Sequence, residues 1–304
     1  MLRSILLKLS ESKSFGHWVA TNASMRRMSH RFVAGETLDE ALEAARACNG
    51  AGMMATLDYL GENVNTTADA QKARDAYLEI FDRISQAKLN ANVSCKLSQL
   101  GLDLSVELCE GLVLSIAERA SAHDNFLRID MESSAYTQHT VEIVKRVRAQ
   151  IPTVGTVIQS YLYRSESDVH DLLSYGCRVR LCKGAYKESM EVAYPRKADV
   201  DANYVRLMRL LLPSGFYHGI ATHDPRMIAE TIRWAAEKQI SKGDFEFQML
   251  YGVRTDLQRR LVRDGYRIRI YIPYGRDWFP YFMRRLAERP ANVGFFLKNF
   301  LRSS

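Results

Sequence analysis

Short apolar runs and longer amphipathic stretches alternate along most of this chain. After a region of helical character that ends near Cys48, each apolar run closes on polar residues, and the stretch behind it carries apolar positions three and four residues apart. Short apolar runs are typical of strands, and the three-and-four spacing is typical of helices. The pattern predicts eight strands, at residues 53–59, 91–96, 126–131, 153–159, 178–183, 217–222, 245–250 and 268–272.

The helical stretches begin at recognisable capping residues. Ser105 precedes one of them, and Asp224 followed by Pro225 opens another, which is a favourable pair for an N-cap and first turn. The first stretch carries one apolar stripe, formed by Ala73, Tyr77, Ile80, Phe81 and Ile84. These starts support the helical interpretation of the stretches between the strands.

Eight repeats of strand then helix predict an α/β fold with a parallel sheet, and eight strands can close into a barrel. We therefore expect a (βα)8 TIM-like barrel, with an open doubly wound sheet as the alternative. Residues 1–48 are expected to form an N-terminal helical extension packed on the barrel. Residues 49–304 would form the barrel itself, with a C-terminal helix over its mouth.

Composition excludes several classes of protein. The chain has 304 residues, 47% apolar and 25% charged, so it is neither collagen-like nor of low complexity. Its five cysteines are odd in number and include no CxxC pair, which favours reduced thiols in the cytoplasm over a disulfide scaffold or a zinc knuckle. No apolar run approaches the roughly 18 residues of a membrane span, so we expect no membrane-spanning helix. The only membrane association that we consider is peripheral contact with the inner face of the cytoplasmic membrane.

The net charge of +7 is unevenly distributed. Residues 251–304 hold twelve Lys or Arg and four Asp or Glu, so the basic character belongs to this segment. A local positive field suits an anionic substrate, a phosphate-bearing cofactor or an anionic membrane surface. Nucleic acid is not expected, because no nucleic-acid-binding motif accompanies the charge.

Polar residues recur where the predicted strands end. In barrels of this kind the catalytic groups lie at the carboxyl ends of the strands and in the following loops. The candidates there are Asp58, Glu62, Lys96, Asp130, Glu132, Gln159, Arg180, Lys183, Thr222, His223, Gln248 and Tyr271. No HxH pair is present, so we expect no metal site.

Two of these strand-end residues are lysines. Lys96 or Lys183 could form a Schiff base, as in barrel aldolases, and this stays open as an alternative. Anion binding is favoured, because both lysines, Arg180 and the basic C-terminal segment would then act together. The letters Gly50 to Ala55 match G-x-G-x-x-A, but they follow a helix and precede a strand, which is the reverse of the order in a dinucleotide-binding motif.

The C-terminal helix carries a further candidate site. Tyr281, Arg284, Arg285 and Glu288 recur at three-and-four spacing, so most of them share one face. That face is either an ion-paired surface or a carboxylate-binding surface, because paired arginines with aromatic residues suit a carboxylate in a partly apolar pocket.

Five sequence motifs follow one another in order along the chain. They are Asp130-Met-Glu-Ser-Ser, Arg180-Leu-Cys-Lys183-Gly184-Ala185-Tyr186-Lys-Glu, Ala221-Thr222-His223-Asp224, Glu246-Phe-Gln-Met-Leu-Tyr-Gly252, and Tyr281-x-x-Arg284-Arg285-Leu-Ala-Glu288. With them the chain resembles the proline dehydrogenase family, both its monofunctional bacterial form and the corresponding domain of bifunctional proline-utilisation proteins. The resemblance covers essentially the whole chain.

The resemblance implies an FAD enzyme that oxidises L-proline to Δ1-pyrroline-5-carboxylate and passes the electrons to a membrane quinone. Residues 49–304 would then be the FAD- and proline-binding catalytic domain. This activity agrees with the residues, because a zwitterionic amino acid needs a carboxylate clamp and a flavin performs hydride chemistry without a metal or a protein nucleophile.

Matching the motifs assigns roles to individual residues. Arg284, Arg285 and Lys96 would hold the proline carboxylate, Tyr271, Tyr281 and Leu250 would shape the pocket around the ring, and Tyr186 would line the substrate side. The catalytic residues would be Asp130, in a supporting or proton-handling role, and Arg180, near the flavin N5 edge. The residues expected to bind FAD are Met131, Gln159, Arg180, Lys183, Gly184, Ala185, Thr222, His223 and Glu288, with the backbone N–H groups at Lys183 to Ala185 near the phosphates.

A gate is expected over the bound substrate. Glu62 is the acidic residue of the small and polar loop after the first strand, and Arg284 would lie on the helix that crosses the mouth. We expect an ion pair between them that closes over proline. The alternative is that Glu62 is a solvated loop carboxylate, since exposed ion pairs contribute little.

Overall fold

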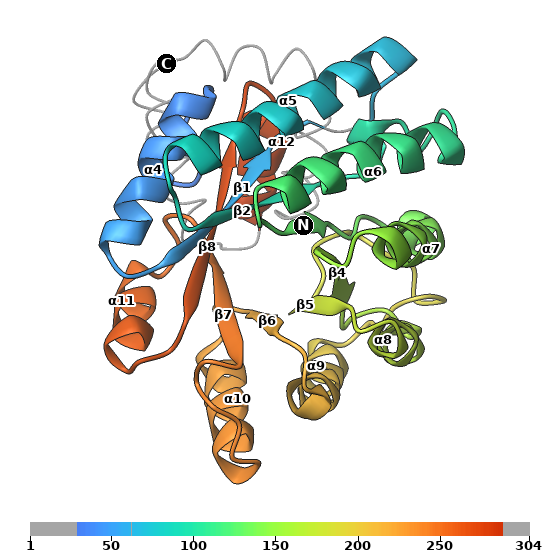
Figure 1. Ribbon diagram of the computed structural model, residues 1–304. Coiled ribbons are helices and arrows are strands. Elements are labelled where there is room, and N and C mark those ends of the chain that lie inside the picture. Colours follow the sequence, from blue (N-terminus) through green and yellow to red (C-terminus); the bar gives the residue numbers. More distant parts are fainter. Residues whose placement is uncertain (1–28, 62, 288–304) are drawn as a thin grey trace, which may run out of the picture.

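The computed structural model describes residues 29–61 and 63–287. Eight parallel strands form a closed barrel in the order of the sequence, and the last strand pairs with the first (Figure 1). The strands are β1 (Met54–Tyr59), β2 (Ala91–Cys95), β3 (Leu127–Ile129), β4 (Val154–Gln159), β5 (Arg178–Cys182), β6 (His218–Ala221), β7 (Phe245–Leu250) and β8 (Ile268–Tyr274). The predicted α/β barrel is confirmed, and the open doubly wound sheet is wrong.

Helices surround the barrel (Figure 1). They are α4 (Leu38–Gly50), α5 (Thr67–Gln86), α6 (Val106–Ala122), α7 (Ser134–Gln150), α8 (Ser165–Ser174), α9 (Lys197–Leu211), α10 (Pro225–Glu237), α11 (Thr255–Arg263) and α12 (Trp278–Ala287), with short 3₁₀ turns at Ser98–Leu100 and Leu212–Ser214. Among the described residues, no helix is both long enough and apolar enough to cross a membrane.

The predicted helix starts are confirmed. The Ser105 hydroxyl accepts a hydrogen bond from the Leu108 backbone N–H at the start of α6, and the Asp224 side chain accepts from the Arg226 N–H at the start of α10. The whole predicted stripe of α5 is buried. These caps satisfy backbone donors that have no partner inside the helix.

The last strand is longer than predicted. The pattern places its end at residue 272, whereas β8 continues to Tyr274. Pro273 lies opposite Asp58 of β1, and its carbonyl accepts a hydrogen bond from the Ala34 backbone N–H at 2.9 Å. A proline usually ends a strand because it cannot donate to the ladder, and here its carbonyl keeps a partner.

The barrel interior is polar. Barrels of this class are usually filled by Val, Ile and Leu, but Arg180 on β5 donates across the interior to Ser94 on β2 at 3.1 Å. Other charged side chains of the strands are also buried, among them Arg128, Glu246 and Arg269. The apolar strand residues, such as Leu57 and Ile220, belong to the main hydrophobic core.

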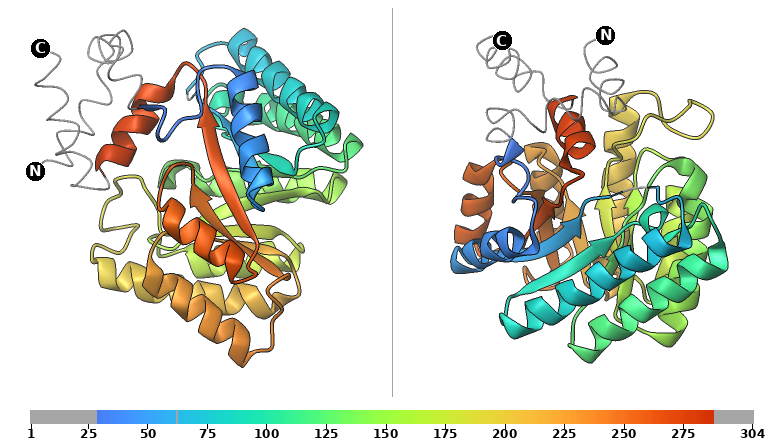
Figure 2. Two further views of the ribbon diagram at one scale, coloured as in Figure 1. Left: turned by 90° about the vertical axis from the view of Figure 1, so that its left-hand side faces the viewer. Right: turned by 90° about the horizontal axis from the view of Figure 1, so that it is seen from above.

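Two helices lie outside the regular alternation. Helix α4 precedes β1 and packs against β1 and β8, with Ala41, Leu42, Ala45 and Cys48 buried. Helix α12 follows β8 and lies at one end of the barrel (red in Figure 2). The boundary expected near residue 48 stays a prediction, and residues 1–28 of the expected extension lie outside the described residues.

Candidate active site

A cavity of about 410 Å³ lies where the strands end, and α12 contributes to its wall. It is lined by Asp58, Lys96, Asp130, Met131, Val157, Arg180, Cys182, Lys183, Gly184, Ala185, Tyr186, Ala221, Thr222, His223, Asp224, Gln248, Met249, Leu250, Tyr271, Tyr281, Arg284 and Arg285. Its volume is in the range of small-molecule and cofactor sites.

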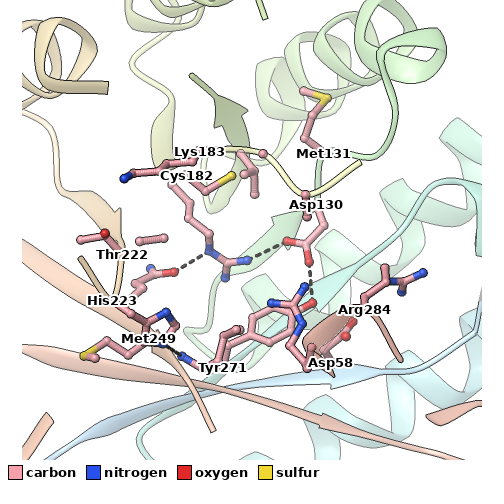
Figure 3. A pocket seen from close by; sticks show the side chains of 18 of the residues that line it. Asp58, Asp130, Met131, Cys182, Lys183, Thr222, His223, Met249, Tyr271 and Arg284 are labelled. Carbon is pink, nitrogen blue, oxygen red and sulfur yellow. Dashed lines mark hydrogen bonds and ion pairs between the residues drawn. The ribbon is translucent and has the colours of Figure 1, made fainter. Parts of the chain in front are cut away.

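Asp130 joins two other side chains that line the cavity. Its Oδ1 accepts a hydrogen bond from Arg180 Nη1 at 2.8 Å, and its Oδ2 accepts from the Tyr271 hydroxyl at 2.7 Å (Figure 3). The Arg180 guanidinium also lies over the Tyr271 ring, 5.1 Å from the centroid. Burial and the nearby charge of Asp130 hold the pKa of Tyr271 well above its usual value. Tyr271 is therefore a phenol that donates, and both carboxylate oxygens of Asp130 are engaged.

Gln248 holds the other side of Arg180. Its Oε1 accepts from Arg180 Nε, and its Nε2 donates to Glu246 Oε1. Glu246 fixes the orientation of this amide, because the end that donates to a carboxylate must be the NH₂ group. Gly219 on β6 makes room for it, since a Cβ there would lie 2.4 Å from Gln248 Nε2.

A buried ion pair joins Lys96 and Asp58. Lys96 Nζ lies 2.9 Å from Asp58 Oδ1, and the side chains are only 8% and 1% exposed. Burial and the charge of Asp130 raise the pKa of Asp58, while Lys96 opposes the shift. The pair adds a cation to the cavity without adding net charge.

Lys183 belongs to a wider ionic cluster. It lies 2.9 Å from Asp224, the N-cap of α10, and 2.5 Å from Asp201 on α9. Burial lowers the pKa of Lys183, but hydrogen bonds to the two carboxylates outweigh it, so the pKa is raised. Lys197 and Arg226 also contact these carboxylates, so the cluster has three cations and two anions.

Gly184 is required by packing. Its φ is +108°, and a Cβ would lie 2.4 Å from the Tyr161 ring. This conformation is accessible to glycine and strained for other residues. The motif match predicts that the backbone N–H groups at Gly184 and its neighbours lie near the phosphates of FAD, which is one reason for a glycine here. Packing against Tyr161 is a second reason.

The segment after β6 contributes Thr222 and His223. The Thr222 hydroxyl accepts from the Asp224 N–H at 3.0 Å, and His223 Nε2 accepts from the Leu250 N–H at 2.9 Å. Since Nε2 is an acceptor, the neutral ring carries its proton on Nδ1. The bond from Leu250 ties the end of β7 to the segment after β6 at the edge of the cavity.

Helix α12 provides cations at the cavity wall. Tyr281, Arg284 and Arg285 all line the cavity, and the Arg285 guanidinium lies 5.1 Å from the centre of the Tyr281 ring. Figure 3 places Arg284 on the same side of the cavity as Asp58. The α12 face is therefore part of the cavity wall, and the alternative of a merely ion-paired surface is not needed to explain it.

Of the residues that were assigned a role in the sequence analysis, all but three line the cavity. Gln159 does not line the cavity; its buried amide donates to the backbone carbonyls of Met131 and Glu132. Its role beneath Met131 could not be recognised from strand position alone. Glu62 and Glu288 lie outside the described residues, so the gate and the contact of Glu288 with FAD stay predictions.

Some contributors had no predicted role. Asp58 and Gln248 were recognised as strand-end residues only, yet they hold Lys96 and Arg180. Asp201 carried no signal, because it lies on α9 and meets Lys183 through the fold. Within residues 29–61 and 63–287, no group of three or more His, Cys, Asp or Glu side chains is placed to hold a metal ion.

The cavity residues fit the flavin cofactor that the resemblance implies. The surplus cation of the Lys183 cluster suits a pyrophosphate. Gln159 Oε1 is buried and has no hydrogen-bond partner in the described part of the chain, so an acceptor remains next to Met131. Lys183, Thr222 and His223 would hold the cofactor, and Arg180 would face its reactive ring.

Comparisons with known proteins agree with this fit. Residues 41–298 match the family model described as proline dehydrogenase. The chain is 41% identical to proline dehydrogenase 1 of Bacillus subtilis, over 99% of this chain and all of that protein. It is also 41% identical to proline dehydrogenase of Deinococcus radiodurans, over 91% of each chain.

A solved structure shows the same architecture. Proline utilization A from Bdellovibrio bacteriovorus, inactivated by N-propargylglycine, superposes with a TM-score of 0.82 at 25% sequence identity. The match covers 93% of this chain and 38% of that longer protein.

Proposed function

Because the chain belongs to the proline dehydrogenase family, we propose that it oxidises L-proline to Δ1-pyrroline-5-carboxylate and that FAD is its resident cofactor. When bound, FAD would supply the two-electron acceptor for the CH–NH bond of proline. The observation that carries the proposal is one cavity in which the arginines of α12 and the hydrogen-bonded Asp130–Arg180–Tyr271 network meet.

The cavity residues can bind a zwitterion. Arg284, Arg285 and Lys96 would engage its carboxylate through charge-assisted hydrogen bonds. Leu250 and Tyr281 offer apolar surface to the ring, and Tyr186 lines the same cavity. Binding would orient proline and displace water from the site.

Asp130 acts as a positioning residue in this proposal. Each of its carboxylate oxygens already accepts a hydrogen bond, one from Arg180 and one from Tyr271. A carboxylate so engaged holds its neighbours in place more readily than it takes a proton. Arg180 would then keep a fixed positive charge beside the ring that gains electrons.

The Schiff-base aldolase is less well supported. An attacking lysine must be a neutral amine at working pH, whereas the pKa of Lys183 is raised by its two carboxylate partners. Lys96 is held in an ion pair with Asp58. Both lysines therefore serve better as fixed cations.

The proposed electron acceptor is a membrane quinone, reached by peripheral contact with the membrane. Family membership supports this part of the proposal. It is tested by mixing the proline-reduced protein with a quinone analogue and following reoxidation of the flavin.

The visible spectrum of the purified protein tests the function. We expect a flavin spectrum that L-proline bleaches in the absence of oxygen and that D-proline leaves unchanged. A colourless protein that is trapped on a lysine by borohydride and substrate would instead establish the aldolase. A flavin that L-proline does not reduce would reject the proposed substrate.

A further inference from the structure

A second cavity of about 400 Å³ lies at the opposite end of the barrel, where the strands begin. The charged residues that line it are Lys88, Asp124, Arg128, Arg178, Glu246 and Arg269, besides a histidine. Four of these six are cations and two are anions. Arg269 is already matched by Glu246, at 2.7 Å. The remaining cations exceed the remaining carboxylate.

Arg128 is the buried cation of this cavity. It is 3% exposed and lies over the Phe126 ring, 4.7 Å from the centroid. Its Nη1 donates to the carbonyls of Thr156 and Arg178, but its Nε has no hydrogen-bond partner. No carboxylate in the described part of the chain forms an ion pair with it. A guanidinium stays charged, and a buried charge without a counterion is costly.

The electrostatics agree with this geometry. Burial and the charge of Arg180 lower the pKa of Arg128 to about 9. A shift in this direction means that the surroundings disfavour the cation. An anion in the adjoining cavity would remove the penalty.

The sequence makes room for the guanidinium. At Gly155 on β4, a Cβ would lie 2.3 Å from the Arg178 carbonyl and 3.1 Å from Arg128 Nη1. Any larger residue would push Arg128 away from the carbonyl to which it donates. A glycine inside a strand weakens the strand and often marks a close approach. The placement of Arg128 is therefore built into the fold.

Arg178 provides a second guanidinium for the same place. It is the exposed first residue of β5, and it lies 5.3 Å from the centre of the same Phe126 ring. It forms no ion pair with the carboxylates of residues 29–61 and 63–287. The two arginines therefore flank one aromatic ring, and both line the cavity.

We propose that this cavity binds a small oxyanion, a free or esterified phosphate or a carboxylate, between Arg128 and Arg178. Guanidinium groups recognise such oxygens with paired hydrogen bonds. The cavity is larger than a bare ion, so an organic anion fits. This site is separate from the proposed proline site, and its test does not use proline oxidation.

Thermal unfolding of the purified protein tests the site. Inorganic phosphate and succinate are titrated separately at constant ionic strength, with sodium chloride as the balance. At saturation we expect one of them to raise Tm by about 4 °C, because a ligand that binds the folded state stabilises it. The two titrations distinguish a phosphate site from a carboxylate site.

Arg178→Gln is the diagnostic variant, because the side chain is exposed and its loss should not prevent folding. We expect the half-saturating anion concentration to rise at least tenfold, and Arg178→Lys to give a smaller rise because it keeps the charge but not the fork. Arg233→Gln, an exposed substitution on α10, is the matched control and should keep the full response.

Two results would overturn the proposal. One is the absence of a saturable shift in the parent protein with either anion. The other is an unchanged shift in Arg178→Gln, which would place the anion elsewhere, for instance at the arginines of α12.

Discussion

Buried cations at the two ends of the barrel differ in whether a protein carboxylate pairs with them. At the carboxyl end, Arg180 pairs with Asp130 and Lys96 pairs with a buried aspartate. At the amino end, Arg128 has carbonyl acceptors and an aromatic ring but no described carboxylate partner. Protein carboxylates hold Arg180 and Lys96 in the first cavity before a ligand arrives. In the second cavity Glu246 pairs with Arg269, and a counterion for Arg128 has to come from outside the described chain.

A column of hydrogen bonds joins the two ends. Glu246 lines the amino-end cavity and Gln248 the carboxyl-end cavity, and residues two apart on a strand point to the same side. Glu246 accepts from Arg269 and from Gln248, which in turn accepts from Arg180. A change at the amino end can therefore reach the guanidinium of the proposed active site through two side chains.

The largest expected effect comes from removing the carboxylate of Glu246, which joins Arg269 to Gln248 in this column of hydrogen bonds. Burial raises the pKa of Glu246, but Arg269 and the hydrogen bonds of Gln248 and Tyr217 outweigh it, so the pKa is lowered and Glu246 is a carboxylate. Glu246→Gln would leave Arg269 buried without a counterion. We expect the free energy of unfolding to fall by about 3–5 kcal/mol in urea denaturation, as for other broken buried pairs.

A surface carboxylate provides the control for Glu246. Glu230 pairs with Arg233 on the exposed side of α10, and Glu230→Gln should cost less than about 1 kcal/mol. If the two variants lose similar stability, Glu246 does not hold the column together, and the two ends of the barrel are independent.

The next effect concerns the cations that face the substrate. Replacing Arg284 or Arg285 with Met should raise the KM for L-proline at least tenfold, because each lost charge-assisted bond costs roughly 1.5–3 kcal/mol. Tm should change little, since both side chains are only partly buried on α12. Steady-state kinetics and thermal unfolding measure the two quantities separately. An unchanged KM in both variants would contradict the carboxylate clamp.

The fold could be predicted because its signals are local. All eight strands occur within two residues of their predicted ends, since each is a short apolar run followed by an amphipathic helical stretch. Strand β8 differs because it continues beyond its predicted end and includes Pro273. Strand β1 and Ala34 supply pairing partners that a local sequence pattern does not show.

The site could be predicted only in part. Position at a strand end identified Lys96, Asp130 and Arg180, because all parallel strands end at the same side of the barrel. The partners that hold them could not be assigned, since Asp58 meets Lys96 only through the pairing of β1 and β2. Motif letters included Glu246, but not its bond to Arg269.

The amino-end cavity was not predicted at all. Arg128 and Arg178 lie within strand patterns, where a polar residue is easily taken for a solvent-facing position. Their importance depends on Gly155 and Phe126, which are neighbours only in the folded barrel. A glycine inside a strand was the one signal in the sequence that could have indicated a close approach.

The smallest effect tests the cationic character of the amino end through pH. His218 on β6 is buried, its Nδ1 accepts from the Val179 N–H at 3.0 Å, and burial together with the charges of Arg128 and Arg178 lowers its pKa to about 3. The unfolded chain binds a proton near pH 6.5 and the folded chain does not, so the stability from neutral His218 is complete above pH 6.5 and is lost progressively from there down to about pH 3.

Between pH 7 and pH 5.5 we expect the free energy of unfolding to fall by about 1.3 kcal/mol. Carboxylates with lowered pKa values lose their contribution at lower pH, and the comparison with His218→Gln separates the contribution of His218 from that of other groups. Urea denaturation at the two pH values measures the loss, which His218→Gln should remove and His170→Gln, at an exposed position of α8, should retain. An equal loss in the parent and in His218→Gln would mean that His218 is not held neutral by this end of the barrel.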